Sequence, residues 1–376
     1  MSKRRRHGDG SIFQRKDGRW VGLVDGGRVD GQRQRRAYYG DTFREVQEQL
    51  KVALHAQQQG LPLGGHGKTV GSFLSEWIEG QQSKIRPTTW RRYSDFVTYA
   101  TKHVGHIALE KLTPEDVERL METRLKAGAA PATVRQLRAV LRRALGQAEK
   151  RRYVPRNVAA LADPPRVERR QMTALNEDQA NAFLSAASEH RLSALFAVAL
   201  DTGMREGELL ALKWAAVDLE RGTLQVNTTL QATPDGFEFA PTKTAKSRRQ
   251  VTLTRAAVTA LRRHKVQQAK ERIDFGPGWD DLDLVFPNAV GRPVNASNLL
   301  HQQFYPLLKR AGVPHIRFHD LRHTYASIAL GRGVPLKVVS ETLGHSSIAI
   351  TADTYQHVTP SMSRASADAM DAVHGT

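Results

Sequence analysis

The stretch HDLRHT at residues 319–324 sets two histidines and an arginine on a segment that leads into a helix. An earlier stretch, TGMREGEL at residues 202–209, follows an apolar helical run and predicts a new helix from Met204. Arg205 is then expected in the first helical turn, beside backbone N–H groups that favour anions. A cation there disfavours the helix unless an anion joins it. We therefore expect an anion-binding site in the C-terminal half of the chain.

The rest of this half predicts helices interrupted by a small sheet, because three segments alternate like short antiparallel strands. The turn before the third segment is tight and very basic, and it contains Lys243. Further on, one helix closes at Gly344 just before His345, and the next helix contains Tyr355. The three strand-like segments are residues 223–231, 236–240 and 249–254.

The order of these polar residues resembles that of a known family, the tyrosine site-specific recombinases or phage integrase family. Its pattern of Arg, Lys, His-x-x-Arg, His and Tyr is followed across residues 175–358, with no departure at the matching positions. The resemblance implies a mixed α+β catalytic domain and an enzyme that transfers DNA strands without ATP, metal or any other cofactor. The matching positions are Arg205, Lys243, His319, Arg322, His345 and Tyr355.

The resemblance implies that Tyr355 attacks the scissile phosphate and leaves a 3′-phosphotyrosyl link and a free 5′ hydroxyl. A tyrosine hydroxyl has a pKa near 10, so it needs in-line placement and cations that stabilise the developing charge. Arg205 and Arg322 would hold the non-bridging oxygens, a task that suits a bidentate guanidinium. A 5′ hydroxyl from a partner duplex can reverse the step, because the phosphotyrosine keeps the bond energy.

The remaining matching positions are expected to transfer protons or bind the phosphate. By the resemblance, Lys243 would protonate the departing 5′ oxygen, and His319 would act as general acid/base near the Tyr355 proton. His345 would hydrogen-bond a phosphate oxygen. Lys246 lies in the same turn as Lys243 and is the alternative general acid.

Acidic residues beside the matching positions are expected to support them. Glu206 and Glu208 are expected to orient Arg205 or to bind the neighbouring backbone. Asp320 is expected to support Arg322 or a histidine in the same way.

Several of these residues also allow a purely structural interpretation. Tyr355 alone would be read as a half-buried core residue, His319 as a helix cap and Arg322 as a surface partner of Asp320. A metal-binding face is a further interpretation of histidines spaced by four, although no His-Glu-x-x-His pattern accompanies them and the chain has no cysteine. These histidines are His315, His319 and His323.

Charge points to a polyanionic partner. The 376 residues include 56 Lys and Arg against 38 Asp and Glu, a net charge of +18, and Arg outnumbers Lys by 40 to 16. Residues 1–60 carry 13 basic and 7 acidic side chains and residues 61–170 carry 21 and 11, whereas residues 171–376 carry 22 and 20. Lys and Arg that neutralise phosphates release condensed counterions, so nucleic acid is the expected partner. The two N-terminal segments are expected to clamp it.

Other classes are excluded or disfavoured by composition. Without cysteine the chain has no disulfide framework, thiol nucleophile or cysteine-ligated metal site. No uncharged apolar run approaches the roughly 20 residues of a membrane span, and no signal peptide follows the basic start. We therefore expect a cytoplasmic protein with no membrane partner.

Residues 1–60 predict a three-stranded sheet followed by a helix. The Asp-Gly at residues 17–18 signals a hairpin, and Thr42 with Glu45 forms a capping-box pattern for a helix through about Leu54. By resemblance this segment is an arm-type DNA-binding domain. Its strands are expected over residues 11–15, 19–24 and 33–40, and its DNA-binding residues are expected to be Arg15, Arg19, Arg33, Arg35 and Arg36.

Residues 69–163 predict a four- or five-helix bundle with a basic side. The resemblance implies that this bundle is a SAM-like core-binding domain, reached through a linker at 61–68 and left through another at 164–174. The catalytic domain is then expected over 175–360, and residues 361–376 form a tail that is either exchanged between subunits or disordered. The basic side is expected to bind DNA through Arg135, Arg138 and Arg142.

The expected fold is therefore multidomain and mainly α with small β-sheets, and the expected function is DNA integration. By resemblance, a homotetramer would join a mobile element to a chromosomal site through a Holliday junction. It would bind core and arm-type sites on double-stranded DNA, helped by a host DNA-bending protein and an excision factor. A type IB topoisomerase is the nearer alternative, and a non-catalytic DNA-binding regulator is the more distant one.

Overall fold

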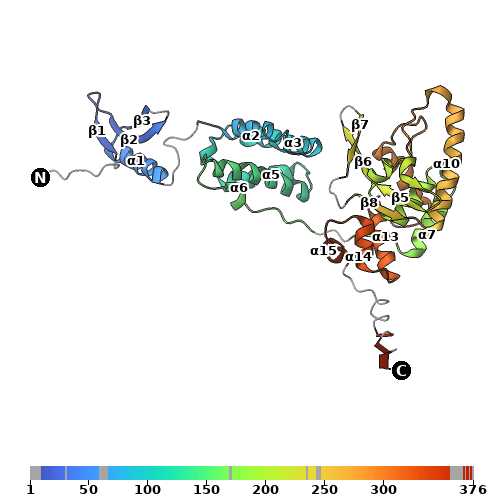
Figure 1. Cartoon of the computed structure of the whole chain (residues 1–376). Helices are drawn as coiled ribbons and strands as arrows, with labels where there is room; N and C mark the ends of the chain where they lie inside the picture. Colours follow the sequence, from blue (N-terminus) through green and yellow to red (C-terminus); the bar gives the residue numbers. More distant parts are fainter. Residues whose placement is uncertain are drawn as a thin grey trace. The chain divides into compact units, whose positions relative to one another are not determined.

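The computed structural model describes residues 10–29, 32–58, 67–168, 172–233, 236–242 and 247–355, together with six residues between 367 and 374. The chain divides into two compact units, Met1–Arg169 and Arg170–Thr376 (Figure 1). Among the described residues, no helix has both the length and the apolar character needed to cross a membrane. Most of the expected linker at 61–68, residues 169–171 of the expected linker at 164–174, and most of the tail lie outside the described residues.

The first module of unit 1 is the predicted three-stranded sheet with one helix. Arg15 N–H bonds to the Arg19 carbonyl across the predicted hairpin, and the Thr42 hydroxyl accepts from the Glu45 N–H at the start of the helix. Its small core consists of Val24, Val46, Leu50 and Ala53. The elements are β1 (Ser11–Gln14), β2 (Trp20–Val29), β3 (Gln32–Gly40) and α1 (Phe43–Gln58), and the antiparallel order is β1-β2-β3.

Two boundaries in this module differ from the prediction. Strand β2 runs to Val29, beyond the expected end at residue 24, because it pairs with β3 across a register shift between Asp25 and Arg28. Such a shift is typical of a β-bulge, which glycine tolerates well. Helix α1 continues to Gln58, beyond the expected end at Leu54.

The predicted helical bundle forms the second part of unit 1. The Thr69 and Thr113 hydroxyls each cap a helix in a reciprocal capping box, and prolines occupy the first positions of three helices. The expected apolar face of residues 131–150 is buried. The elements are α2 (Val70–Glu79), α3 (Pro87–Val104), η1 (Leu109–Lys111), α4 (Pro114–Lys126), α5 (Pro131–Lys150) and α6 (Val158–Leu161).

Unit 2 is a helical domain with two small sheets around one large core. Asn176 opens its first helix through a capping box with Gln179. Phe183, Phe196 and Phe304 meet edge-on or stacked inside the core. Its helices are α7 (Glu177–Ala187), α8 (Ser193–Thr202), α9 (Glu206–Leu210), η2 (Trp214–Ala216), α10 (Arg255–Phe275), η4 (Gly276–Gly278), α11 (Ala296–Asn298), the π-helical η5 (Leu299–Phe304), α12 (Tyr305–Arg310), α13 (Asp320–Gly331), α14 (Leu336–Leu343) and α15 (Ile348–Tyr355).

The single strand expected over residues 223–231 is wrong, because the chain breaks at Asn227 into two strands of different sheets. Residues 223–226 pair with residues 249–252, the strand that follows the basic turn, whereas residues 228–233 form a hairpin with residues 236–241. The sheets have the orders β4-β5-β8 and β6-β7. Their strands are β4 (Val217–Asp218), β5 (Thr223–Val226), β6 (Thr228–Thr233), β7 (Gly236–Pro241) and β8 (Arg249–Thr252).

Candidate active site

Arg205 lies at the junction of α8 and α9. Helix α8 ends at Gly203, whose φ of 59° is left-handed, and a Cβ there would lie 2.5 Å from Leu343 Cδ2. Arg205 then adopts an extended conformation as the N-cap of α9, one residue before the helix that was expected to contain it. Its side chain is half-buried and points its guanidinium at Glu208.

Glu208 joins two arginines. Arg205 Nη1 donates to Glu208 Oε1 at 2.7 Å, and Arg249 Nη2 donates to Glu208 Oε2 at 2.9 Å. Burial would raise the pKa of Glu208, but the adjacent charges of Arg249 and Arg205 outweigh it and the pKa is lowered. Arg249, on β8, also donates to the Thr342 carbonyl at the end of α14. The carboxylate therefore fixes Arg205 and ties α9 to β8.

Arg322 is the most deeply buried cation of the site. Its exposed fraction is 2%, and Nη1 donates to the Gly203 carbonyl at 2.8 Å. Its other terminal nitrogen, Nη2, is buried and has no hydrogen-bond partner among the described residues. Burial, followed by repulsion from Arg205 and Arg249, lowers the pKa of Arg322 to about 9. A buried cationic donor that lacks a hydrogen-bond partner and lies near other cations strongly favours the binding of an anion.

His319 precedes Arg322 by one helical turn. It occupies the N-cap position of α13, but its side chain makes no capping hydrogen bond, so the helix-cap interpretation is wrong. Its pKa falls to about 4, first because the surrounding protein displaces water from the ring and then because His323, Arg322 and Arg205 are near. The residue nevertheless keeps an exposed surface. A neutral imidazole thus stands open to solvent beside both arginines.

Tyr355 is the last residue of α15 and contacts His323, a histidine outside the family pattern. His323 Nδ1 lies 2.6 Å from the Tyr355 hydroxyl oxygen, and the two ring centroids are 5.6 Å apart. The Tyr355 ring packs against the buried cluster of Ala326, Leu330, Val339 and Leu343. Burial raises the pKa of Tyr355 to about 12, so its hydroxyl keeps its proton at neutral pH.

His345 follows the left-handed Gly344 that ends α14. Its Nδ1 lies 2.7 Å from the Thr351 hydroxyl, and Thr351 is buried in α15. The pKa of His345 falls to about 4, because of burial and then because of Arg322 and Arg205. Beside it, Arg248, Lys337 and Glu341 line an open hollow of about 690 Å³.

The three acidic residues expected to support the site differ in the partners that they contact. Glu208 supports Arg205 as expected, but Glu206 Oε1 is buried without a partner among the described residues, and burial raises the pKa of this carboxyl. Asp320 does not support Arg322. Its carboxylate accepts from Arg317 at 2.7 Å, so the interpretation of Arg322 as its surface partner is also wrong.

The two lysines of the basic turn, Lys243 and Lys246, lie outside the described residues. Residues on either side of the turn are described: Thr242 directly follows β7 and has a buried hydroxyl, and Arg249 begins β8 in contact with Glu208. Which lysine is the general acid remains a prediction from sequence.

The three histidines spaced by four, His315, His319 and His323, do not form one cluster. The His315 ring stacks on Tyr305 with centroids 4.5 Å apart, whereas the His319 and His323 rings meet edge-on at 5.2 Å. In the part of the chain that the structure describes, no group of three or more His, Asp or Glu side chains has the arrangement of a metal site.

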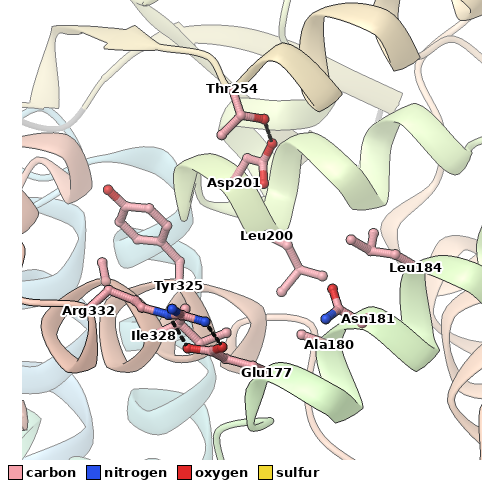
Figure 2. Close-up of a pocket in the computed structure, with 11 residues that line it drawn as sticks. Glu177, Ala180, Asn181, Leu184, Leu200, Asp201, Thr254, Tyr325, Ile328 and Arg332 are labelled. Carbon is pink, nitrogen blue, oxygen red and sulfur yellow. Dashed lines mark hydrogen bonds and ion pairs between the residues drawn. The ribbon is translucent and has the colours of Figure 1, made fainter. Parts of the chain in front are cut away.

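A separate pocket of about 410 Å³ opens between α7, α8 and α13 (Figure 2). The ion pair between Arg332 and Glu177 and the hydrogen bond from Thr254 to Asp201 line it. Burial raises the pKa of Asp201. None of the described residues that match the family pattern lines this pocket.

The arginines expected to bind DNA from unit 1 differ in exposure. Arg138 is already used within the bundle, because its guanidinium donates to the Ala162 and Ala160 carbonyls at 2.7 and 3.1 Å. The side chain of Arg33 lies outside the described residues. The remaining expected residues are exposed, namely Arg15, Arg19, Arg35, Arg36, Arg135 and Arg142.

Comparisons with known proteins agree with this arrangement. Residues 173–362 match the phage integrase family, and residues 69–123 match the phage integrase N-terminal SAM-like domain. An integrase of Streptomyces ambofaciens is 34% identical over 95% of this chain and 94% of its own length. A XerC-like tyrosine recombinase of Caldanaerobacter subterraneus subsp. tengcongensis is 29% identical over 90% of this chain and 92% of its own length.

Solved structures share the fold. The Tn1549 transposon integrase in complex with a circular intermediate DNA superposes with a TM-score of 0.69 at 19% identity. The match covers 81% of this chain and 99% of that one. A lambda integrase tetramer bound to a Holliday junction gives a TM-score of 0.57 at 19% identity, over 93% of this chain and 96% of that one.

The fold and the ordered cluster of arginines, histidines and tyrosine define a DNA strand-transfer enzyme of the tyrosine recombinase class. The chain belongs to the phage integrase family. It is a site-specific integrase of mobile elements, which favours the recombinase over the topoisomerase and regulator alternatives.

Proposed function

We propose that this integrase cleaves DNA by attack of Tyr355 on a phosphodiester that Arg322 and Arg205 hold. The observation that carries the proposal is the buried Arg322 Nη2, which lacks a partner among the described residues although the same guanidinium is fixed by the Gly203 carbonyl. A non-bridging phosphate oxygen would satisfy this donor and neutralise the repulsion between Arg322 and Arg205. The product is a 3′-phosphotyrosyl link and a free 5′ hydroxyl.

Two neutral histidines, His345 and His319, would lie beside the bound phosphate. With the Thr351 hydroxyl donating to Nδ1, neutral His345 carries its proton on Nε2 and can donate it to a phosphate oxygen. His319 stands close enough to Arg322 and Arg205 for their charges to lower its pKa, so it would contact the bound phosphate as well. Lys243, or Lys246 in its place, would protonate the departing 5′ oxygen.

The remaining modules would bring DNA to this site. The bundle over residues 69–163 would bind the core site through Arg135 and Arg142, and residues 1–60 would bind arm-type sites through their exposed arginines. Four subunits would assemble on two duplexes, as lambda integrase does on a Holliday junction. A host DNA-bending protein and an excision factor would set the direction of recombination.

A nicked suicide duplex carrying the core site tests the proposal. The core site can be read from the junctions between the element and the chromosome beside this reading frame. We expect the protein to form a covalent adduct that migrates with the DNA in a denaturing gel, and Tyr355→Phe to form none. An adduct that persists in Tyr355→Phe contradicts Tyr355 as nucleophile.

Deletion of residues 1–60 tests the arm-binding role separately. We expect the shortened protein to bind and cleave the core site but to lose recombination of substrates that carry arm sites. Unchanged recombination of those substrates contradicts the assignment.

A further inference from the structure

The hydroxyl of the proposed nucleophile is bonded to a residue outside the family pattern. His323 Nδ1 and the Tyr355 oxygen are 2.6 Å apart, a short distance for an N···O hydrogen bond. The His319 ring instead meets the edge of the His323 ring. Of the two histidines in the HDLRHT stretch, the second therefore contacts the tyrosine.

Helix geometry explains this division. His319 and His323 are four residues apart, so they lie on the same face of α13 and one turn apart. His319 lies at the start of this helix, three residues before Arg322, and the charges of Arg322 and Arg205 contribute to lowering its pKa. The next turn brings His323 to the end of α15, where Tyr355 lies.

The protonation states favour a bond in which Tyr355 donates. Burial lowers the pKa of His323, Asp320 opposes this effect, and Arg317 and Arg322 add to it. The other titratable neighbours are His319 and His345, which are both neutral, and Tyr355, whose pKa burial raises. A protonated phenol then faces a neutral imidazole, so the Tyr355 O–H can donate to Nδ1 and the imidazole keeps its own proton on Nε2.

We propose that His323 is the general base that takes the proton of Tyr355 during strand cleavage and returns it during rejoining. This inference rests on the proposed role of Tyr355 as nucleophile. In cleavage the Tyr355 O–H bond breaks and its proton passes to His323 Nδ1, while the tyrosyl oxygen forms the new bond to phosphorus. The bond from phosphorus to the 5′ oxygen breaks, and that oxygen receives a proton from the general acid in the basic turn. Rejoining runs the same transfers backwards, so protons and bonds balance.

The assignment leaves His319 free for another task. A histidine beside both arginines can hydrogen-bond the phosphate, whereas the base must reach the attacking oxygen. The structure satisfies both requirements with adjacent turns of one helix.

The test is single-turnover cleavage of the nicked core-site duplex between pH 5 and pH 9. The wild-type rate should rise with pH until His323 is deprotonated and then level off. His323→Asn retains an amide acceptor near the place of Nδ1 but has no basicity, so it should cleave about 100-fold more slowly at pH 7. Its rate should continue to rise with pH. His315→Ala removes a histidine of the same segment that stacks on Tyr305, and it should behave as wild type.

Two further measurements separate a base from a merely structural residue. Imidazole added to His323→Ala should restore cleavage in proportion to the concentration of its neutral form. A substrate with sulfur in place of the bridging 5′ oxygen has a leaving group that needs no acid. It should rescue Lys243→Ala but leave His323→Asn slow, because the tyrosyl proton must still be removed.

The outcomes are distinct. Cleavage by His323→Asn within twofold of wild type, with an unchanged pH profile, overturns the proposal. A slow His323→Asn with a wild-type pH profile and no rescue of His323→Ala by imidazole also overturns it, and shows that His323 only positions Tyr355. An adduct formed by Tyr355→Phe instead refutes the proposed nucleophile, whatever His323 does.

Discussion

Arginines of the two units are used in opposite ways. In unit 2, Arg322 is buried and the side chain of Arg249 is only 6% exposed, and each is held by a carbonyl or carboxylate, so their charges are fixed before DNA arrives. In unit 1, Arg135 and Arg142 stand on an exposed helix face. Under the proposed function, the nearly neutral unit 2 would carry out the chemistry and the strongly basic unit 1 would attract the DNA, so the placement of a charge would matter more than its amount.

The largest effect is expected where the charge is buried. Arg322→Lys removes the planar fork that bonds Gly203 and leaves Nη2 for the phosphate, so we expect cleavage to fall about 10³-fold. DNA binding measured by gel shift should change little. Arg332→Lys, at the exposed end of the same helix, is the matched control. Cleavage by Arg322→Lys within tenfold of wild type would argue against phosphate binding by this side chain.

Glu208→Ala should cost stability as well as activity. It leaves Arg249 and Arg205 without the carboxylate they share, and a broken buried ion pair costs about 3 kcal/mol. Denaturant unfolding of the full chain measures this loss. A change below about 1 kcal/mol, the range of surface pairs, would show that the network adds little.

The same carboxylate predicts a pH dependence. The folded-state pKa of Glu208 lies below its ordinary value of 4.5, so its stabilisation is complete above pH 4.5 and disappears as the pH falls through the folded-state pKa. Glu208→Gln lacks this titration. The stabilities of the two proteins should therefore converge as the pH falls from about 7 to about 3. A constant difference would be inconsistent with the charged pair.

Arg138 is the exception in unit 1 and sharpens the comparison. Arg138→Ala frees the Ala160 and Ala162 carbonyls at the end of α6, so we expect a loss of about 2 kcal/mol of unfolding free energy. Arg142→Ala, one turn away and exposed, should change it by no more than about 0.5 kcal/mol. Equal effects of the two substitutions would contradict the structural role of Arg138.

The smallest effect is expected from the exposed arginines. Arg135→Ala and Arg142→Ala should each weaken core-site binding and reduce the slope of log affinity against log salt by about 1. The cleavage rate of the bound complex should stay at the wild-type value. A slope that does not change would remove these side chains from the DNA interface.

Much of the fold could be read from local signals. Thr69 and Thr113 marked helix starts because a hydroxyl followed by an acceptor three residues later caps the first turn. The division of residues 223–231 could not be read, because β5 and β6 look alike in sequence and differ only in the strand each one meets. Helix α1 extends to Gln58, beyond its expected end at about Leu54, because no residue between these two positions signals the end of a helix.

The candidate site was likewise predictable only in part from the sequence. The order of arginines, histidines and tyrosine was visible in the sequence, since the pattern repeats residue types that the chemistry needs. The partners of these residues were not visible, because Arg249 meets Glu208 across 41 positions and Thr342 across 93. His323 belongs to the HDLRHT stretch, but only the three-dimensional arrangement of α13 and α15 shows that it reaches Tyr355.

Gly203 carries a consequence for how this enzyme can change shape. Its carbonyl binds Arg322, and its chain continues directly to Arg205 two residues later. The backbone between the carbonyl that holds Arg322 and the Cα of Arg205 therefore spans about 7 Å at most. Any motion that slides α13 past α8 must either carry both arginines together or break the bond to Gly203. The Gly203 carbonyl oxygen thus couples the positions of the two arginines that would hold the phosphate under the proposed function.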